Sequence, residues 1–416
     1  MDTGDTAWML TSSALVLFMT PGLALFYGGM VRAKNALGML MKNFIAMGIV
    51  TITWIVVGYS LAFGPDIGGG LLGGLDYFGL KDVSNIIPEG ELGAIHGATV
   101  PDSVIMVFQM MFAIITPALI SGAIAERMKF TAWVVFIAIW SIVVYAPMAH
   151  WVWSANGFIF KDLKAVDFAG GTVVHINAGA AALAAVLVLG PRLGFRREII
   201  RPHALPLTLL GAGMLWFGWF GFNSGSAFAA NGLAANAFIV TQIAAAVAGT
   251  VWALMEHIRH GKATTLGFAS GAVAGLVAIT PASGYVGPVG AIAIGIAAGV
   301  ICFLALQIKF KANFDDALDV VAVHLVGGIL GSLMVGLFAD SELNPLTADG
   351  LFFGGGVEQL GRQAIAVVIA FGYSFVLTYV LARILDATMG LRAAEADERR
   401  GLDLALHEEQ SYVFSE

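Results

Sequence analysis

The chain of 416 residues is 58% hydrophobic and only 12% charged. A soluble domain usually carries about 25% charged residues, so this composition excludes an ordinary cytosolic enzyme. Disorder is also excluded, because disordered chains are poor in hydrophobic residues and rich in charge. The net charge of −7 indicates no nucleic-acid partner, and the one cysteine, Cys302, excludes a disulfide framework. The 52 glycines instead favour membrane helices that pack closely.

Apolar runs long enough to cross a bilayer, about 20 residues each, recur along the whole chain. They predict an all-α polytopic membrane protein with eleven transmembrane helices. Residues 1–386 then form the membrane domain, and the charged residues 387–416 form a cytoplasmic C-terminal tail. We expect the spans near residues 7–31, 38–63, 100–125, 130–152, 170–190, 204–224, 231–256, 265–281, 286–308, 319–339 and 357–386.

The basic residues between these runs sort by side of the membrane. If the connections alternate from an outside N-terminus, the 21 Lys and Arg residues fall on the inside except Lys81, Lys161, Lys164 and Arg362. Cytoplasmic loops are enriched in Lys and Arg. The pattern therefore predicts an N-terminus outside and a C-terminus inside.

The two halves of the chain contain related segments at one common offset. Residues 121–125 resemble residues 270–274, and residues 174–176, which contain His175, resemble residues 323–325, which contain His324. The matches lie on the third and eighth runs and on the fifth and tenth runs. This spacing predicts two inverted units of five helices plus one extra helix, with a transport path between the units. The alternative is chance similarity between helices rich in small residues.

An ionisable residue inside a membrane span is costly and usually functional. His175 and His324 lie in mid-span at equivalent positions of the two halves, so we expect them to face each other and share a proton. The alternative is two unrelated core histidines on separate helices. Glycines on the same runs would let the two helices approach closely, namely Gly170, Gly171, Gly179, Gly327, Gly328 and Gly331.

Charged residues also occur at the ends of the spans. Asp167 lies two turns before His175, where its carboxylate either caps the helix N-terminus or contacts a substrate. Adjacent Glu126 and Arg127 are expected to form an ion pair in an inner loop. The sequence contains no nucleophile–base pair, metal-ligand spacing or phosphate loop. It therefore predicts no enzyme, no metal and no cofactor.

Three strings make the chain similar to a known family. Residues 18–29 read FMTPGLALFYGG, residues 167–178 read DFAGGTVVHINA and residues 218–226 read GWFGFNSGS. On these strings the chain resembles the ammonium transporter (Amt/Mep/Rh) family, in its bacterial AmtB-type form. The resemblance covers nearly the whole chain and implies an inverted repeat of eleven helices, assembled as a homotrimer with one pore in each subunit.

The resemblance also implies roles for individual residues. A site that recruits ammonium on the outer side corresponds to Trp153, Phe112 and Ser226. A gate of stacked phenyl rings corresponds to Phe112 and Phe222, and the pore with its proton relay corresponds to His175 and His324. The acidic residue near the pore mouth corresponds to Asp167.

The implied function is transport of ammonium in nitrogen metabolism, across a lipid bilayer that would be the cell inner membrane. NH4+ would lose its proton at the outer vestibule, and NH3 would pass the pore; methylammonium would be an analogue. The family's cytoplasmic partner, a PII-type regulatory protein (GlnK), would bind the inner face. Two alternatives remain: a facilitator for another small neutral solute, and an ammonium sensor.

Overall fold

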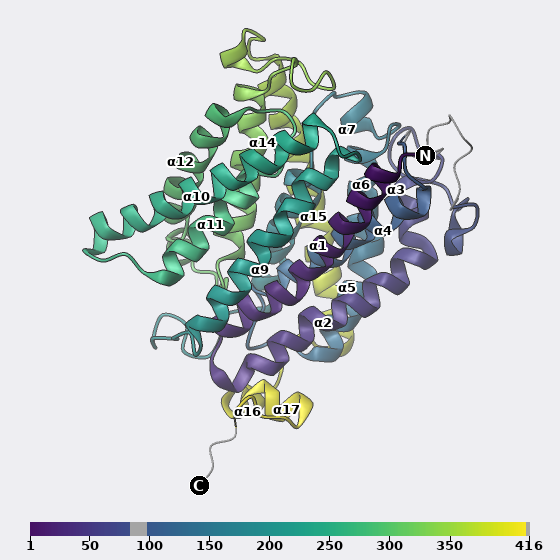
Figure 1. Cartoon of the computed structure of the whole chain (residues 1–416). Coiled ribbons are helices and arrows are strands. Elements are labelled where there is room, and N and C mark those ends of the chain that lie inside the picture. The colour runs from purple at the N-terminus through teal and green to yellow at the C-terminus, as the bar shows by residue number, and fades with distance from the viewer. Residues whose placement is uncertain (84–97, 413–416) are drawn as a thin grey trace.

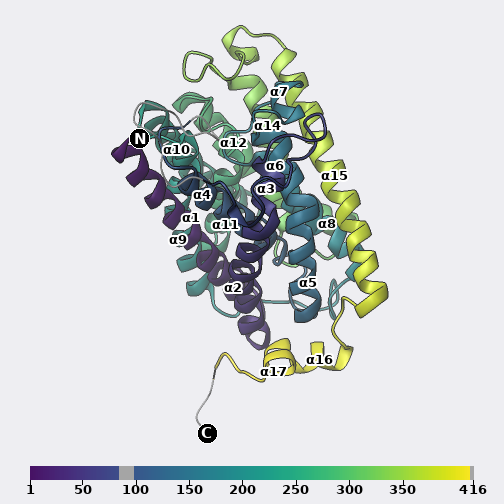
Figure 2. The same cartoon turned by 90° about the vertical axis from the view of Figure 1, so that its right-hand side faces the viewer.

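The computed structural model describes residues 1–83 and 98–412, and this part of the chain is helical apart from its connections and two isolated β-bridges. The long helices run alongside one another in one bundle (Figure 1). The N-terminus and the C-terminal tail lie at opposite ends of this bundle (Figure 2). We call these ends the N-terminal end and the tail end.

Ten helical segments are long and apolar enough to cross a membrane, as expected for a multi-pass membrane protein. Six of them contain more than one element. The ten segments are α1 (Thr3–Met30); η1 (Ala33–Asn35), α2 (Ala36–Thr53), η2 (Trp54–Gly58) and α3 (Tyr59–Phe63); α4 (Asp102–Ile120); α5 (Phe130–Trp140), η4 (Ser141–Tyr145), α6 (Ala146–Trp153) and α7 (Phe158–Lys161); η5 (Gly171–Ile176) and α8 (Asn177–Leu189); α9 (Leu205–Ser224) and η6 (Gly225–Ala227); α10 (Gly232–His260); α12 (Pro288–Ala305) and α13 (Ile308–Lys311); η7 (Val321–Leu325) and α14 (Val326–Phe338); and α15 (Glu358–Met389).

The remaining described helices are shorter. The eighth predicted span corresponds to α11 (Thr265–Ile279), which is apolar but has only 15 residues. It packs against both α10 and α12 in the bundle. The others lie outside the long segments, and they are η3 (Phe78–Leu80), η8 (Leu351–Phe353), α16 (Glu395–Arg400) and α17 (Leu402–His407).

Glycines bring the fifth and tenth predicted spans together. A Cβ atom on Gly179 of α8 would lie only 2.5 Å from the backbone nitrogen of Leu325, at the end of η7. A Cβ atom on Gly328 of α14 would lie 3.0 Å from Cβ of His175. A larger side chain at Gly179 would therefore force the two segments apart. The predicted close approach is confirmed at Gly179 and Gly328, whereas Gly327 and Gly331 instead face Val277 and Ala278.

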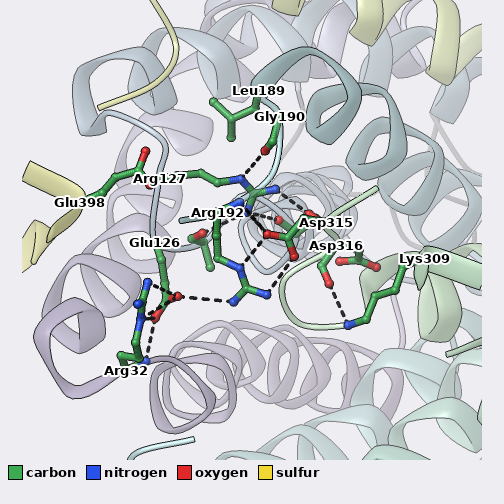
Figure 3. Close-up of polar contacts among 12 residues, drawn as sticks. Arg32, Glu126, Arg127, Leu189, Gly190, Arg192, Lys309, Asp315, Asp316 and Glu398 are labelled. Carbon is green, nitrogen blue, oxygen red and sulfur yellow. Dashed lines mark hydrogen bonds and ion pairs between the residues drawn. The ribbon is translucent and has the colours of Figure 1, made fainter. Parts of the chain in front are cut away.

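Buried charges join the loops at the tail end of the bundle (Figure 3). Glu126 lies 3.0 Å from Arg32 and 3.4 Å from Arg192, and it also accepts the backbone N–H of Arg32. Arg192 donates two hydrogen bonds of 2.9 Å to the carboxylate of Asp315. Four separate loops are thereby held by one network of alternating charges.

The prediction of an ion pair between Glu126 and Arg127 is wrong. The backbone of Glu126 is left-handed, with φ of 68°, so the two neighbouring side chains diverge. Arg127 donates instead to the carbonyl oxygens of Gly190 and Asp315, at 2.8 and 2.5 Å. This guanidinium therefore satisfies backbone carbonyls of two loops that would otherwise be buried without partners.

The arginines of this network keep the two buried carboxyls, Glu126 and Asp315, in their charged form. Burial raises the pKa of Glu126, but Arg192 and Arg32 outweigh burial and keep that pKa below its ordinary value. Burial likewise raises the pKa of Asp315, and the guanidinium groups of Arg192 and Arg127 lower it further than burial raises it. Both carboxyls therefore stabilise the fold above about pH 4, and this stabilisation is lost as the pH falls below that value.

The tail docks on the start of α2. The Asp403 carboxylate of α17 accepts the backbone N–H groups of Leu37 and Gly38, at 2.9 and 2.7 Å. Asn35, the residue before α2, makes no side-chain cap of its own, and its Oδ1 accepts the N–H of Leu402 at 2.9 Å. The tail therefore supplies the cap that α2 lacks.

We expect Arg192→Met to lower the free energy of unfolding by roughly 3–5 kcal/mol, because it leaves the buried Glu126 and Asp315 without their shared cation. Thermal unfolding of the purified protein in detergent at neutral pH measures the change. Arg197→Met, at an exposed position of the same loop, is the matched control and should have little effect. Equal stability of the two variants would contradict a structural role for the network.

Candidate pore

Three cavities follow one another along the bundle, and the first lies near the N-terminal end. The predicted recruitment residues Phe112, Trp153 and Ser226 line it together. The Trp153 ring meets Phe112 edge to face, with centroids 5.6 Å apart and planes at 86°. Its indole N–H is occupied, because it donates to the carbonyl oxygen of Asp167 at 3.0 Å. The aromatic faces, rather than the indole N–H, are thus the groups available to a cation.

Hydrogen-bond acceptors complete this first cavity. The Ser226 hydroxyl donates to the carbonyl oxygen of Phe222 at 2.9 Å, so its lone pairs remain available. Gln109 of α4 also lines the cavity, and its Oε1 is buried without a hydrogen-bond partner among the described residues. Buried polar groups are nearly always paired, so this amide oxygen beside the cavity is an acceptor available to a bound water or ligand.

Two phenyl rings separate the first cavity from the second. Phe112 of α4 and Phe222 of α9 lie 4.3 Å apart between centroids, at an interplanar angle of 43°. Each ring is only 1% exposed. Phe112 lines the first cavity and Phe222 lines the second, so the pair closes the path between them.

The two predicted histidines meet below this pair. His175 Nδ1 and His324 Nδ1 lie 3.3 Å apart, a contact that requires one ring to donate and the other to accept. Both residues lie on π-helical turns, η5 and η7. Such turns are rare and occur often at functional sites. The two imidazoles therefore face each other, as the sequence predicts.

Ring contacts fix the orientation of the pair. Trp219 stacks on His175 with centroids 5.5 Å apart, and its indole N–H donates to Thr280 Oγ1 at 2.8 Å. His175 Nε2 is buried and has no hydrogen-bond partner within the described ranges. Apart from the imidazoles, the second cavity is lined by apolar residues, and they are Met19, Leu23, Phe26, Ile115, Leu119, Val174, Leu215, Trp219, Phe222 and Val273.

The third cavity continues from His324 toward the tail end. His324, Phe26 and Val273 line both the second and the third cavity. The third is more polar, since Glu256 and Asp319 also line it. The histidine pair therefore lies between an apolar chamber and a chamber with carboxylates.

Asp167 does not face the cavities freely. One carboxylate oxygen accepts the N–H groups of Gly170 and Gly171 at 2.8 and 2.7 Å, and the other accepts the N–H of Thr172 at 2.6 Å. The carboxylate thus caps the start of η5, the turn that carries His175. Of the two interpretations left open by the sequence, this geometry favours the cap.

Comparison with known proteins agrees with this arrangement. The sequence matches the Ammonium Transporter Family over residues 7–412. It is 52% identical over 434 residues to the ammonium transporter of Mycobacterium tuberculosis H37Rv, covering 100% of this chain and 91% of that protein. It is 48% identical to ammonium transporter Amt1 of Archaeoglobus fulgidus, covering 99% of this chain and 100% of that protein.

Solved structures extend the similarity to the fold. Candida albicans Mep2 superposes with a TM-score of 0.87 at 36% identity, over 95% of this chain and 88% of that one. A structure described as a sensor Amt protein superposes with a TM-score of 0.88 at 32% identity, over 97% and 98% of the two chains. The chain therefore belongs to the ammonium transporter family, whose members are transporters rather than enzymes.

Proposed function

We propose that this protein carries ammonium across a membrane by passing ammonia through the three cavities. The observation that carries the proposal is the contact between His175 and His324, at 3.3 Å, inside an otherwise apolar chamber. Its relatives are named ammonium transporters, which supports the choice of solute. Methylammonium, which keeps three N–H donors, is the expected analogue.

The outer cavity binds NH4+ before the proton leaves. The faces of Phe112 and Trp153 attract the cation, an interaction worth about 2 kcal/mol when water is excluded. Ser226 and Gln109 accept hydrogen bonds from its N–H groups. A potassium ion has the same charge but no N–H group to donate. The site therefore combines charge recognition with hydrogen-bond recognition.

The proton and the ammonia separate at the Phe112–Phe222 pair. Moving an intact ion of this size from water into an apolar medium costs roughly 20 kcal/mol in the idealised limit. Neutral NH3 avoids most of that cost, so it passes the closed phenyl pair and the apolar chamber far more easily. The histidine pair then hydrogen-bonds NH3 and offers the proton a separate route between its two rings.

We extend the proposal to the topology of the chain in the membrane and to its assembly. The short helix α11 also crosses the membrane, which makes eleven spans in all, the two halves form the inverted repeat, and the N-terminus lies outside the cell. The tail end then faces the cytoplasm, as the basic loops favour. The protein lies in the cell inner membrane as a homotrimer that serves nitrogen metabolism, and a PII-type protein (GlnK) binds its tail end.

We expect the double variant His175→Ala/His324→Ala to lose ammonium-selective current, because the proton no longer has an imidazole route through the chamber. Electrical recording on liposomes that contain the purified protein measures this current. His260→Ala, at the end of α10, is the control and should behave like the unchanged protein. A normal, ammonium-selective current in the double variant would exclude the relay.

Gln109→Leu is expected to raise the half-saturation concentration for ammonium about tenfold or more, since a hydrogen bond to a charged group contributes roughly 1.5–3 kcal/mol. The maximal rate should change less, because the phenyl pair and the histidines are untouched. Gln109→Glu keeps an acceptor oxygen and should retain tight binding. If Gln109→Leu transports with an unchanged half-saturation concentration, the amide is not part of the site.

Asp167→Ala is expected to abolish methylammonium uptake, because the start of η5 loses its cap and His175 loses its position. Asp167→Asn retains one acceptor oxygen and should keep part of the uptake. Uptake is normalised to the amount of folded protein in the membrane. Full uptake by Asp167→Ala would show that the cap is dispensable.

A further inference from the structure

A histidine in the tail lies where a proton would be poorly accommodated. His407 ends α17, and its ring meets Phe130 of α5 edge to face, with centroids 4.9 Å apart and planes at 74°. The same ring lies beside the first turn of α2: a Cβ atom added to Gly38 would lie 3.6 Å from His407 Nε2 and 3.3 Å from Asp403 Oδ1. This nitrogen is buried and has no hydrogen-bond partner in the part of the chain that is described.

The charged groups around this ring come from three segments. They are Lys42 of α2, Asp403 of α17 and Glu409 just beyond α17. Lys42 is only 2% exposed, so its ammonium group is poorly screened by water. The Asp403 carboxylate is already bound to two N–H groups of α2. Burial of the ring and Lys42 therefore oppose a second positive charge, while Asp403 and Glu409 favour it.

We propose that His407 is a pH-sensitive latch: its neutral ring holds α17 on α2, and its protonation releases the tail. A proton on the ring would add a second positive charge near the buried Lys42, at a nitrogen that has no hydrogen-bond partner among the described residues. In the released tail the ring is hydrated and takes up that proton without this penalty.

The direction of the pH dependence follows from the docked state. Burial, with Lys42, keeps the pKa of docked His407 below its ordinary value, although Asp403 and Glu409 act in the opposite direction. Docking is therefore favoured above about pH 6.5, the ordinary pKa of a histidine, and weakens as the pH falls below it. Acidification of the side that the tail faces would undock it.

Release of the tail would affect the path that carries His324. It would remove the Asp403 cap from α2 and the Leu402 contact from Asn35. Asn35 also donates to Glu126 at 3.1 Å, and Glu126 belongs to the charge network with Asp315. The loop that contains Asp315 leads into η7 and His324. The latch thus acts on the pore whichever solute the pore carries.

Hydrogen exchange followed by mass spectrometry, on the full chain in lipid nanodiscs, tests the latch. Exchange is compared at about pH 7.5 and about pH 5.5, on either side of an ordinary histidine pKa, after correction for the intrinsic rates. We expect the amides of Leu37, Gly38 and Leu402 to lose protection at the lower pH, while α8 remains protected. Unchanged protection of these three amides would overturn the proposal.

Two substitutions at this position separate the latch from simple packing. His407→Gln cannot gain charge, so its tail should stay docked at both pH values. His407→Lys is charged throughout, so its tail should be released at both, with α8 still protected as a measure of folding. A pH-dependent loss of protection in His407→Gln, or a docked tail in His407→Lys, would contradict the proposal.

A second histidine near the tail provides the matched control. His203 Nδ1 lies 2.9 Å from the carbonyl oxygen of Val31, and its Nε2 lies 3.0 Å from the hydroxyl of Tyr412. Both of these oxygens accept hydrogen bonds, so a proton on His203 would not oppose docking. His203→Gln should keep the full pH response. If the response disappears in this variant and persists in His407→Gln, the sensor is His203.

Discussion

The cost of removing a cation from water is the constraint on which the rest of this structure depends. A path closed by Phe112 and Phe222 and lined by apolar side chains cannot carry a hydrated ion. Under the function proposed above, it carries a small neutral molecule that forms from a cation at the entrance of the path. Polar and aromatic groups line the cavity on the N-terminal side of this barrier, and carboxylates line the cavity on its tail side. A charge is therefore accommodated only where water or a specific partner replaces the hydration that it loses.

Helix packing meets this constraint by making the path narrow. Gly179 and Gly328 let two segments approach until the imidazoles of His175 and His324 touch, and the Asp167 cap fixes the turn that carries one of them. Ordinary α-helical turns would set these side chains at a different angle; both histidines instead lie on π-helical turns. The rings therefore have defined donors and acceptors in a chamber that offers few others.

Much of the helical arrangement could be predicted from the sequence, because bilayer thickness and costly intramembrane histidines each leave a direct pattern. The contacts that depend on local geometry could not. Glu126 and Arg127 are neighbours in sequence, yet a left-handed backbone at Glu126 sends them to different partners. Gln109 was missed because a lone glutamine in a span has no periodicity; its polarity within an apolar run was the available signal. The apolar run that predicts the eighth span does contain a helix, α11, but that helix has only 15 residues. Hydropathy locates an apolar run and does not report where the helix within it ends.

The central claim is that the path carries ammonia and excludes other monovalent cations. Its most direct test uses purified protein in sealed liposomes, with a pH dye inside and with ammonium or potassium gradients of equal size. Ammonium should change the lumenal pH faster than in protein-free liposomes, while potassium should produce neither a pH change nor a current. Equal responses to the two cations, or an ammonium response no faster than in protein-free liposomes, would contradict the claim.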